Sequence, residues 1–310
     1  MTIQQLEYVI ALDNHRNFVR AAESCFVTQP TLTMQVQKLE DEIGFQIFNR
    51  TRKPLQPTRQ GVEFIDGARR IIKEYRLLKS KITQEKEEVS GMYRIGIIPT
   101  LAPYLIHRFL PHFIRYLPDT RLIISEMQSE HIISAIKKDT IDIGIMATPI
   151  NEDQIREIPV YYEPFLAYLP AGHPLLEKEI LDQNELGIDG LLLMEEGHCF
   201  RNQALNICSA TKRNDEMSFE YQSGSIGSLL RLVEEGAGYT LLPELSLEHE
   251  IVNKDNIRRF IHPEPSREIG IVVHSTFSRD GLIMELKNTI SGNIPESFRK
   301  DESFIRIKWR

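Results

Sequence analysis

Two different hydrophobic periods divide this sequence near residue 90. Up to that point, apolar residues recur at the three- and four-residue spacing of amphipathic helices. From Met92 onward, short apolar runs such as Y-R-I-G-I-I at residues 93–98 alternate with segments of helical spacing. Such alternation is typical of an α/β sheet with crossover helices. The 310 residues are therefore predicted to form an α+β multidomain protein, with a helical N-terminal domain and a larger α/β domain.

The α/β half contains several candidate strands. They lie near residues 93–98, 122–126, 141–146, 165–169, 190–194, 239–242 and 269–273. Thr100 and Ser129 each follow one of these strands and begin a segment of helical spacing. Both hydroxyls could be simple N-caps. Ligands bind just beyond the carboxyl ends of strands in open α/β sheets, so both are also candidate ligand groups.

The N-terminal domain begins with the pattern of a helix-turn-helix. Three helices are expected, over residues 6–18, 18–25 and 29–43. Thr28 is placed to cap the third helix, Pro30 suits its first turn, and Gly44 ends it. Such a helix can lie in the major groove of double-stranded DNA. We predict DNA contacts from its N-terminal end and outer face: Thr28, Gln29, Pro30, Thr31, Thr33, Met34, Gln35 and Lys38.

A basic loop follows the third helix, in the segment F-N-R-T-R-K-P-L-Q-P-T-R-Q-G. It is predicted to form a two-stranded wing whose cations meet phosphates: Arg50, Arg52, Lys53 and Arg59. The formal net charge of the chain is −7, but residues 1–87 carry 14 Lys and Arg against 11 Asp and Glu. The alternative is a generic three-helix domain with a solvated basic loop.

A long helix is expected from Thr58 to about Ile82. Its apolar residues fall on two adjacent stripes: Ile65, Ala68, Ile72, Tyr75 and Ile82, flanked by Phe64, Ile71 and Leu78. An isolated helix of this length is predicted to pack against a second copy of itself. The alternative is a helix packed within its own chain. The polar segment at residues 85–91 is interpreted as a hinge.

Two of the three cysteines, Cys199 and Cys208, lie in the motif E-E-G-H-C-F-R-N-Q-A-L-N-I-C. A helix is expected to begin at Cys199, beside His198 and Arg201, where the helix end and the guanidinium would favour the thiolate. Nine helical residues separate the two Cα atoms by about 13 Å, beyond the reach of a disulfide. Bonding would require the helix to unwind, as a redox switch needs. The alternative is two ordinary buried cysteines.

The three cysteines suit a reducing compartment. The N-terminus has no signal-peptide pattern, and no apolar run reaches the length of a membrane span. We therefore expect a cytoplasmic protein without membrane contacts.

The N-terminal segments A-A-E-S-C, T-Q-P-T-L-T and K-L-E-D-E-I-G, with the basic loop, resemble the winged helix-turn-helix of LysR-type transcriptional regulators. The resemblance implies a DNA-binding domain over residues 1–58 and a dimerisation helix with hinge over 59–90. It also implies an effector domain over 91–310, similar to periplasmic binding proteins. One subdomain would comprise about 91–161 with 268–310, and the other about 162–267. The implied partners are operator DNA, RNA polymerase and further copies of the chain, as a dimer or tetramer.

The motif G-H-C-F-R-N-Q-A-L-N-I-C, with G-I-I-P-T-L-A-P-Y-L and P-E-P-S-R-E-I-G, resembles peroxide-sensing members of that family up to about residue 290. The resemblance implies that hydrogen peroxide oxidises Cys199, which then forms a disulfide with Cys208. The implied peroxide pocket comprises Thr100, Ser129, His198, Arg201 and Arg267. Ser129 replaces the threonine common at its position, so it keeps the hydroxyl and loses a methyl group.

The same resemblance implies a regulator that needs no cofactor or metal, is not an enzyme, and is reset by a thiol reductant such as glutaredoxin or thioredoxin. One alternative is a LysR-type regulator that binds a small metabolite and ignores peroxide. Another is a thiol peroxidase. The sequence lacks the Pro-Thr-Cys pattern of peroxiredoxins, and a peroxidase does not need a helix-turn-helix. Cys25 is interpreted as structural. The final stretch E-S-F-R-K-D-E-S-F-I-R-I-K-W-R has no counterpart in the family pattern.

Overall fold

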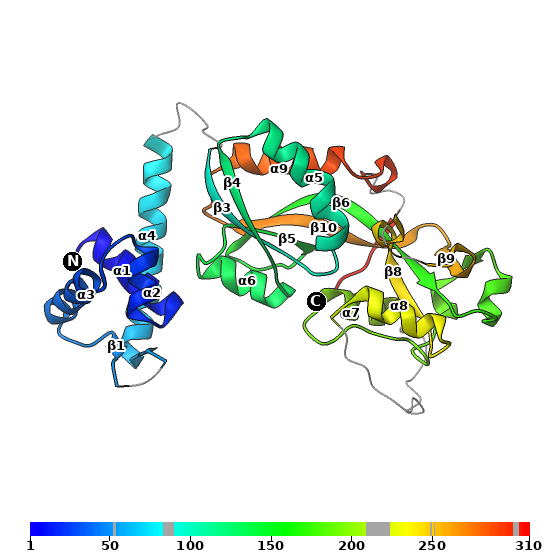
Figure 1. Ribbon diagram of the computed structural model, residues 1–310, viewed down its shortest axis with the longest axis horizontal. Helices are drawn as coiled ribbons and strands as arrows, with labels where there is room; N and C mark the ends of the chain where they lie inside the picture. Colours follow the sequence, from blue (N-terminus) through cyan, green and yellow to red (C-terminus); the bar gives the residue numbers. More distant parts are fainter. Residues whose placement is uncertain (52–53, 83–89, 209–223, 249, 251, 300–303) are drawn as a thin grey trace. The chain divides into compact units, whose positions relative to one another are not determined.

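The computed structural model describes residues 1–51, 54–82, 90–208, 224–248, 250, 252–299 and 304–310. The chain divides into two compact units, which meet in the sequence at Glu87 and Glu88 (Figure 1). Within the described ranges, no helix is both long and apolar enough to cross a membrane.

The N-terminal unit is a winged helix-turn-helix followed by one long helix. Its elements are α1 (Ile3–His15), α2 (Phe18–Ser24), α3 (Gln29–Ile43), β1 (Phe48–Asn49), β2 (Gln56–Pro57) and α4 (Arg59–Ile82). The two short strands pair antiparallel and form the wing. The predicted limits of α3 are confirmed, because the Thr28 side chain accepts a hydrogen bond from the Thr31 N–H and Gly44 ends the helix at φ 81°.

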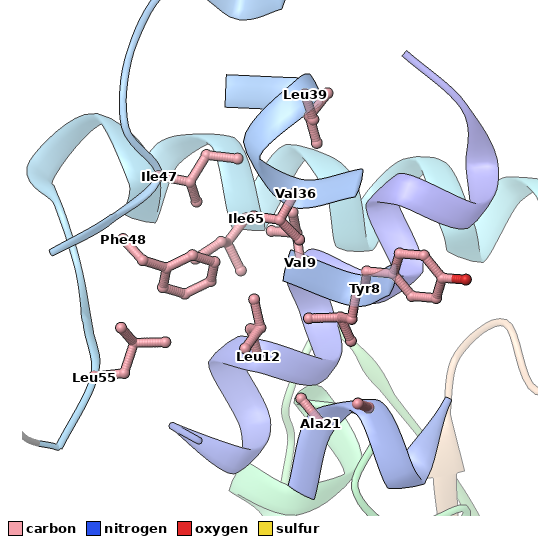
Figure 2. Close-up of a cluster of buried hydrophobic side chains, with 12 residues drawn as sticks. Tyr8, Val9, Leu12, Ala21, Val36, Leu39, Ile47, Phe48, Leu55 and Ile65 are labelled. Atoms are coloured by element: carbon pink, nitrogen blue, oxygen red, sulfur yellow. The ribbon is translucent and has the colours of Figure 1, made fainter. Parts of the chain in front are cut away.

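One apolar core holds the helices and the wing together. Figure 2 shows side chains from α1, α3, α4 and the wing converging on it: Val9, Leu12, Val36, Leu39, Ile47, Phe48, Leu55 and Ile65. Cys25 packs against the same core, as expected of a structural cysteine. The carboxylate of Glu40 on α3 accepts hydrogen bonds from the N–H groups of Ile47 and Phe48, at 2.8 and 3.2 Å. The angle between α3 and the wing is therefore fixed by packing and by a buried carboxylate.

The two apolar stripes of α4 have different partners. Ile65, Ala68 and Ile72 are buried within the chain, the latter two against Leu6 and Ile10 of α1. The prediction that this stripe contacts a second copy is therefore wrong for its first half, because α1 already covers it. Ile71 and Leu78 of the flanking stripe are exposed by 44% and 60%, as is Tyr75 of the first stripe by 42%, and together they form one exposed face. Phe64 of the flanking stripe packs against the core. The side chain of Ile82 lies outside the described residues.

The second unit is an α/β domain built on a mixed sheet. Its helices are α5 (Ala102–Tyr116), α6 (Ser129–Lys137), α7 (Cys199–Ile207), α8 (Ile226–Glu234) and α9 (Asp280–Gly292). Its strands are β3 (Gly91–Ile97), β4 (Thr120–Glu126), β5 (Ile143–Thr148), β6 (Ile155–Tyr168), β7 (Ile180–Leu181), β8 (Thr240–Pro243), β9 (Ile257–Phe260), β10 (Glu264–His274) and β11 (Phe304–Arg306). Single 3₁₀ turns lie at Pro174–Glu177, Gln183–Glu185, Glu244–Glu248, Lys254–Asn256 and Glu296–Arg299.

Two long strands run through the whole domain. The main sheet has the order β4-β3-β5-β10-β6-β9-β7, in which β3 is parallel to both β4 and β5. Strand β10 pairs antiparallel with β5 and with β6 as far as Pro164. From Phe165, β6 pairs with β8 instead. In Figure 1, α5 and α9 cover one face of the first part of this sheet and α6 covers the other. The alternating pattern thus correctly predicted an α/β domain.

The strand expected at residues 190–194 is not formed. The run is largely buried, but it makes isolated bridges instead of a strand, at Leu191 with Tyr239 and at Met194. The Leu191 bridge consists of two backbone hydrogen bonds, from the Leu192 N–H to the Tyr239 carbonyl and from the Tyr239 N–H to the Gly190 carbonyl. The Thr240 hydroxyl also donates to the Leu192 carbonyl. The apolar composition of residues 190–194 therefore reflects the burial of this segment and not a strand of the sheet. The expected segments also missed β7, β9, β11 and the first part of β6, which have weaker apolar patterns.

Candidate functional site

The predicted helix between the two motif cysteines is present as α7. It begins at Cys199, after His198 at the N-cap, and Cys208 is its C-cap residue. Both cysteines are free thiols and both are buried. With nine residues of helical rise between them, their Cα atoms lie about 13 Å apart. A disulfide between them therefore requires α7 to unwind.

The loop before α7 is held against α6. Gly197 has φ 92°, and a Cβ added there would lie 2.7 Å from Oε1 of Gln128, so only glycine permits this approach. The Gln128 amide donates to Glu195 at 3.2 Å, and Nε2 of His198 lies 3.4 Å from the same carboxylate oxygen. His198 is buried. This network joins the N-terminus of α6 to the N-terminus of α7.

Burial dominates the surroundings of the Cys199 thiol. It raises the pKa of Cys199, while the Ser129 hydroxyl, the Arg267 guanidinium and the backbone N–H of Ala147 lower that pKa by smaller amounts. The expectation that the environment favours a thiolate is therefore wrong for this reduced state. The helix N-terminus was predicted correctly, but desolvation of a buried thiol outweighs it.

Neither candidate hydroxyl is a helix cap. Helix α5 begins at Ala102 with Leu101 as its N-cap residue, and α6 begins at Ser129 itself, after Gln128. Within the described chain, the buried Ser129 hydroxyl has no hydrogen-bond partner of normal geometry, although it lies beside the Cys199 thiol. The capping alternative is thus excluded for both residues.

Arg267 is the buried centre of this region. Its Nε and Nη2 donate to Oε2 of Glu163 at 2.9 and 2.8 Å, and Nη1 donates to the Thr100 hydroxyl at 2.9 Å. Its guanidinium also lies over the ring of Phe200, 5.7 Å from the centroid. Both ion-pair partners are fully buried, so each depends on the other for its charge.

Sequence reasoning missed Glu163. A signal was available, since Glu163 is a lone carboxylate at the start of the apolar run 164–169 and a buried charge needs a partner. The Leu245 N–H also donates to it, at 3.0 Å. Burial raises the pKa of Glu163, opposed by the charge and hydrogen bonds of Arg267.

Arg201 is placed differently from the other predicted pocket residues. Its Nη1 donates to the Met194 carbonyl at 2.9 Å, which closes the loop that precedes α7. The guanidinium whose charge lowers the Cys199 pKa is that of Arg267. Arg201 therefore acts on the shape of the loop.

The second cysteine is held by Tyr239, which sequence reasoning also missed. Burial raises the pKa of Cys208 to about 11, although a hydrogen bond with the Tyr239 hydroxyl lowers it slightly. The same hydroxyl donates to the Gly187 carbonyl. While α7 remains helical, Cys208 is a protonated thiol.

The expected DNA-contacting residues of the N-terminal unit are not equally accessible. Most are exposed: Thr28, Gln29, Pro30, Thr31, Met34 and Lys38. Gln35 is half-buried and accepts a hydrogen bond from Gln5 of α1 at 3.2 Å. The Thr33 hydroxyl is buried. Thr33 and Gln35 therefore point outward only in part, and Gln35 is the one that bonds to a neighbouring helix.

The basic residues of the wing also differ. Arg50 donates to Glu40 at 2.6 Å and lies over the Phe18 ring, so it helps to fix the wing on the helices. Arg59 is exposed at the first turn of α4. Arg52 and Lys53 lie outside the described residues.

Family models match both units. The model described as bacterial regulatory helix-turn-helix protein, lysR family, matches residues 3–62. The LysR substrate binding domain matches residues 86–289.

Similar proteins are transcriptional regulators. The DNA-binding transcriptional dual regulator OxyR of Escherichia coli is 35% identical over 274 residues, which are 88% of this chain and 89% of that protein. A hydrogen peroxide-inducible genes activator of Pectobacterium carotovorum is 34% identical over 292 residues, or 94% of this chain and 96% of that protein.

Solved structures resemble most of the chain. Full-length OxyR from Pseudomonas aeruginosa, with a cysteine-to-aspartate substitution, has a TM-score of 0.80 at 30% identity and covers 94% of this chain and 98% of its own. A cysteine variant of OxyR from Corynebacterium glutamicum, bound to hydrogen peroxide, has a TM-score of 0.61 at 25% identity, covering 94% and 92%.

Proposed function

The chain belongs to the LysR family of bacterial transcriptional regulators, and we propose that it senses hydrogen peroxide through Cys199 and thereby changes how it acts on promoter DNA. The main support is the surroundings of Cys199. A buried thiol at the start of α7 lies beside a serine hydroxyl with no other partner of normal geometry in the described chain, within the field of a buried arginine. The similarity to peroxide-inducible activators supports the same chemistry.

The polar groups around the thiol suit a small, neutral oxidant. The Ser129 hydroxyl would donate to one peroxide oxygen. Because Arg267 donates to the Thr100 oxygen, the Thr100 hydroxyl proton points elsewhere and can serve a second oxygen. His198 would complete the pocket and relay a proton. Arg201, bound to the Met194 carbonyl, would hold the loop that carries His198.

Oxidation would proceed in two balanced steps. The Cys199 thiolate attacks one oxygen of hydrogen peroxide, the O–O bond breaks, and Cys199 becomes a sulfenic acid. The leaving hydroxide takes up a proton and departs as water. The Cys208 thiolate then attacks the Cys199 sulfur, the S–O bond breaks, and the disulfide forms. The leaving hydroxide takes up the proton that Cys208 gave up and departs as the second water. Together the two thiols lose two electrons, which reduce one peroxide to two waters.

The second step depends on opening of α7. A thiol with a pKa of about 11 is ionised to roughly one part in ten thousand at pH 7. Cys208 must therefore leave its buried position both to reach Cys199 and to become reactive. A two-state rearrangement of α7 would carry the signal to the rest of the effector domain.

The DNA-binding role would use two copies of the chain. The exposed stripe of Ile71, Tyr75 and Leu78 on α4 offers an apolar face to a second α4. Two helix-turn-helix units would then read two-fold-related half-sites. The oxidised effector domains would change the pairing of these units and the contact with RNA polymerase. A thiol reductant such as glutaredoxin or thioredoxin would restore the dithiol.

A thiol count tests the sensing step directly. Purified reduced protein is treated with one equivalent of hydrogen peroxide, and its thiols are mapped by mass spectrometry. Rapid loss of two thiols as a Cys199–Cys208 link is expected. Three surviving thiols, in protein that still binds DNA, would refute peroxide sensing and favour regulation by a metabolite.

The DNA-binding surface is tested by Lys38→Ala. Lys38 is exposed on α3, and one lost phosphate contact lowers the salt dependence of binding, d log K/d log [salt], by about 1 in magnitude. Operator affinity is measured as a function of salt, with Lys254→Ala in the effector unit as a control of equal charge change. Equal slopes for wild type and Lys38→Ala would remove Lys38 from the interface.

A further inference from the structure

The C-terminal stretch lies against the helix that carries the cysteines. Residues 304–310, here named the C-terminal strap, begin as β11, which pairs parallel with β10. The Ile307 N–H then donates to the Ser266 carbonyl at 2.8 Å. In Figure 1 the C-terminus lies between α6 and α7. The strap therefore extends from the central sheet across to α7.

Three side-chain amides of α7 hold three successive carbonyls of the strap. Gln203 donates to the Ile307 carbonyl at 3.0 Å, Asn206 to that of Lys308 at 2.8 Å, and Asn202 to that of Trp309 at 3.0 Å. Gln203 is fully buried. All three amides lie between Cys199 and Cys208, on the helix that must unwind before a disulfide can form. Each donor keeps its place only while α7 is helical.

The end of the strap is anchored beside the Cys199 thiol. The buried Trp309 indole donates to the Ala147 carbonyl at 3.1 Å, and the Ala147 N–H contacts Cys199. Arg310 stacks on the Trp309 ring and forms ion pairs with Glu130 and Glu152, each at 2.6 Å. Glu130 directly follows Ser129 at the start of α6. The strap thus connects α7 to β5 and α6, the elements that face the thiol.

We propose that the C-terminal strap locks α7 in its helical, reduced form and thereby sets how readily the Cys199–Cys208 disulfide forms. The inference rests on the proposed disulfide switch and adds its control element. Contacts present in the helical form alone stabilise that form, so they oppose oxidation. Loss of the strap contacts shifts the dithiol–disulfide equilibrium toward the disulfide. Each amide–carbonyl bond contributes a factor of about five to that equilibrium.

The test measures the dithiol–disulfide equilibrium of the full chain in glutathione buffers. Trp309→Ala removes the anchor of the strap. Asn202→Ser with Asn206→Ser removes two of its bonds from the α7 side, and serine has nearly the helix propensity of asparagine. We expect each variant to shift the equilibrium constant about tenfold or more toward the disulfide.

Lys308→Ala is the matched control. The Lys308 side chain is exposed, while its backbone carbonyl still accepts from Asn206. This variant is expected to match wild type. Combining Trp309→Ala with the serine pair is expected to shift the equilibrium by less than the product of the separate effects, because both changes release the same contacts. A purely structural weakening of the protein would give independent effects.

The outcomes separate this inference from the switch itself. If wild type forms the disulfide and both strap variants keep its equilibrium constant, the lock is refuted and the switch stands. If wild type forms no Cys199–Cys208 disulfide, the proposed function fails and the lock fails with it. Should Trp309→Ala not fold, the serine pair decides, since Asn202 and Asn206 lie on the exposed side of α7.

Discussion

Cys199→Ser is expected to abolish both the disulfide and the change in DNA binding that follows peroxide treatment. A serine hydroxyl cannot be oxidised to a sulfenic acid, so the variant lacks the sulfur that attacks the peroxide in the first step. Cys208 cannot replace it, because its buried thiol contacts Tyr239, whereas the Ser129 hydroxyl and the Arg267 guanidinium lie around Cys199. The measurement is thiol mapping and operator binding of the variant before and after one equivalent of hydrogen peroxide.

Cys25→Ser is the control for that experiment. Cys25 packs on the core of the N-terminal unit, whereas Cys199 and Cys208 belong to the second unit, and burial raises the pKa of Cys25. The Cys25 variant is expected to form the Cys199–Cys208 disulfide at the wild-type rate. A Cys199→Ser protein that still responded fully to peroxide would remove Cys199 from the mechanism.

Arg267→Met is expected to produce the largest loss of stability among single substitutions in the effector domain. It leaves the fully buried Glu163 carboxylate without its ion-pair partner. Removing one member of a buried pair costs about 3–5 kcal/mol in the free energy of unfolding. The Thr100 hydroxyl also loses a donor. Urea denaturation of the reduced proteins measures the difference.

The loss in Arg267→Met should depend on pH. Burial already raises the pKa of Glu163, and Arg267→Met removes the positive charge that opposes this effect. The folded variant then binds a proton that the unfolded chain releases. Its stability is therefore greatest below the ordinary carboxyl pKa and falls as pH rises through the raised one. Denaturation at pH 5.5 and pH 7.5 gives the sign, with the variant less stable at the higher pH.

Two further variants sharpen this result. Adding Glu163→Gln to Arg267→Met is expected to recover part of the stability and to remove the pH dependence, because the buried group no longer carries a charge. Arg156→Met breaks an ion pair with the exposed Asp280 and is expected to cost under about 1 kcal/mol. A similar cost for the Arg156 and Arg267 variants would contradict the role given to the buried pair.

Local patterns were sufficient for α3 and for the helix between the cysteines. The limits of α3 follow from Thr28, Pro30 and Gly44, which act on backbone groups within a few residues. The same is true of the start of α7 at Cys199. Local patterns failed where a buried segment does not pair with a strand. Residues 190–194 are such a segment, since they are largely buried but do not join the sheet as a strand.

The amino-acid sequence by itself determined the helix-turn-helix, the alternation of strands and helices, and the helical separation of Cys199 from Cys208. These features depend on interactions between residues close in the chain, and the spacing of apolar residues in the sequence reveals them. Only the tertiary structure decided that desolvation raises the Cys199 pKa, that Ser129 is not a cap, and that Arg267 meets Glu163 across 104 residues. It alone placed the C-terminal strap on α7. Such contacts join distant segments, and their strength depends on burial, which no periodicity in the sequence encodes.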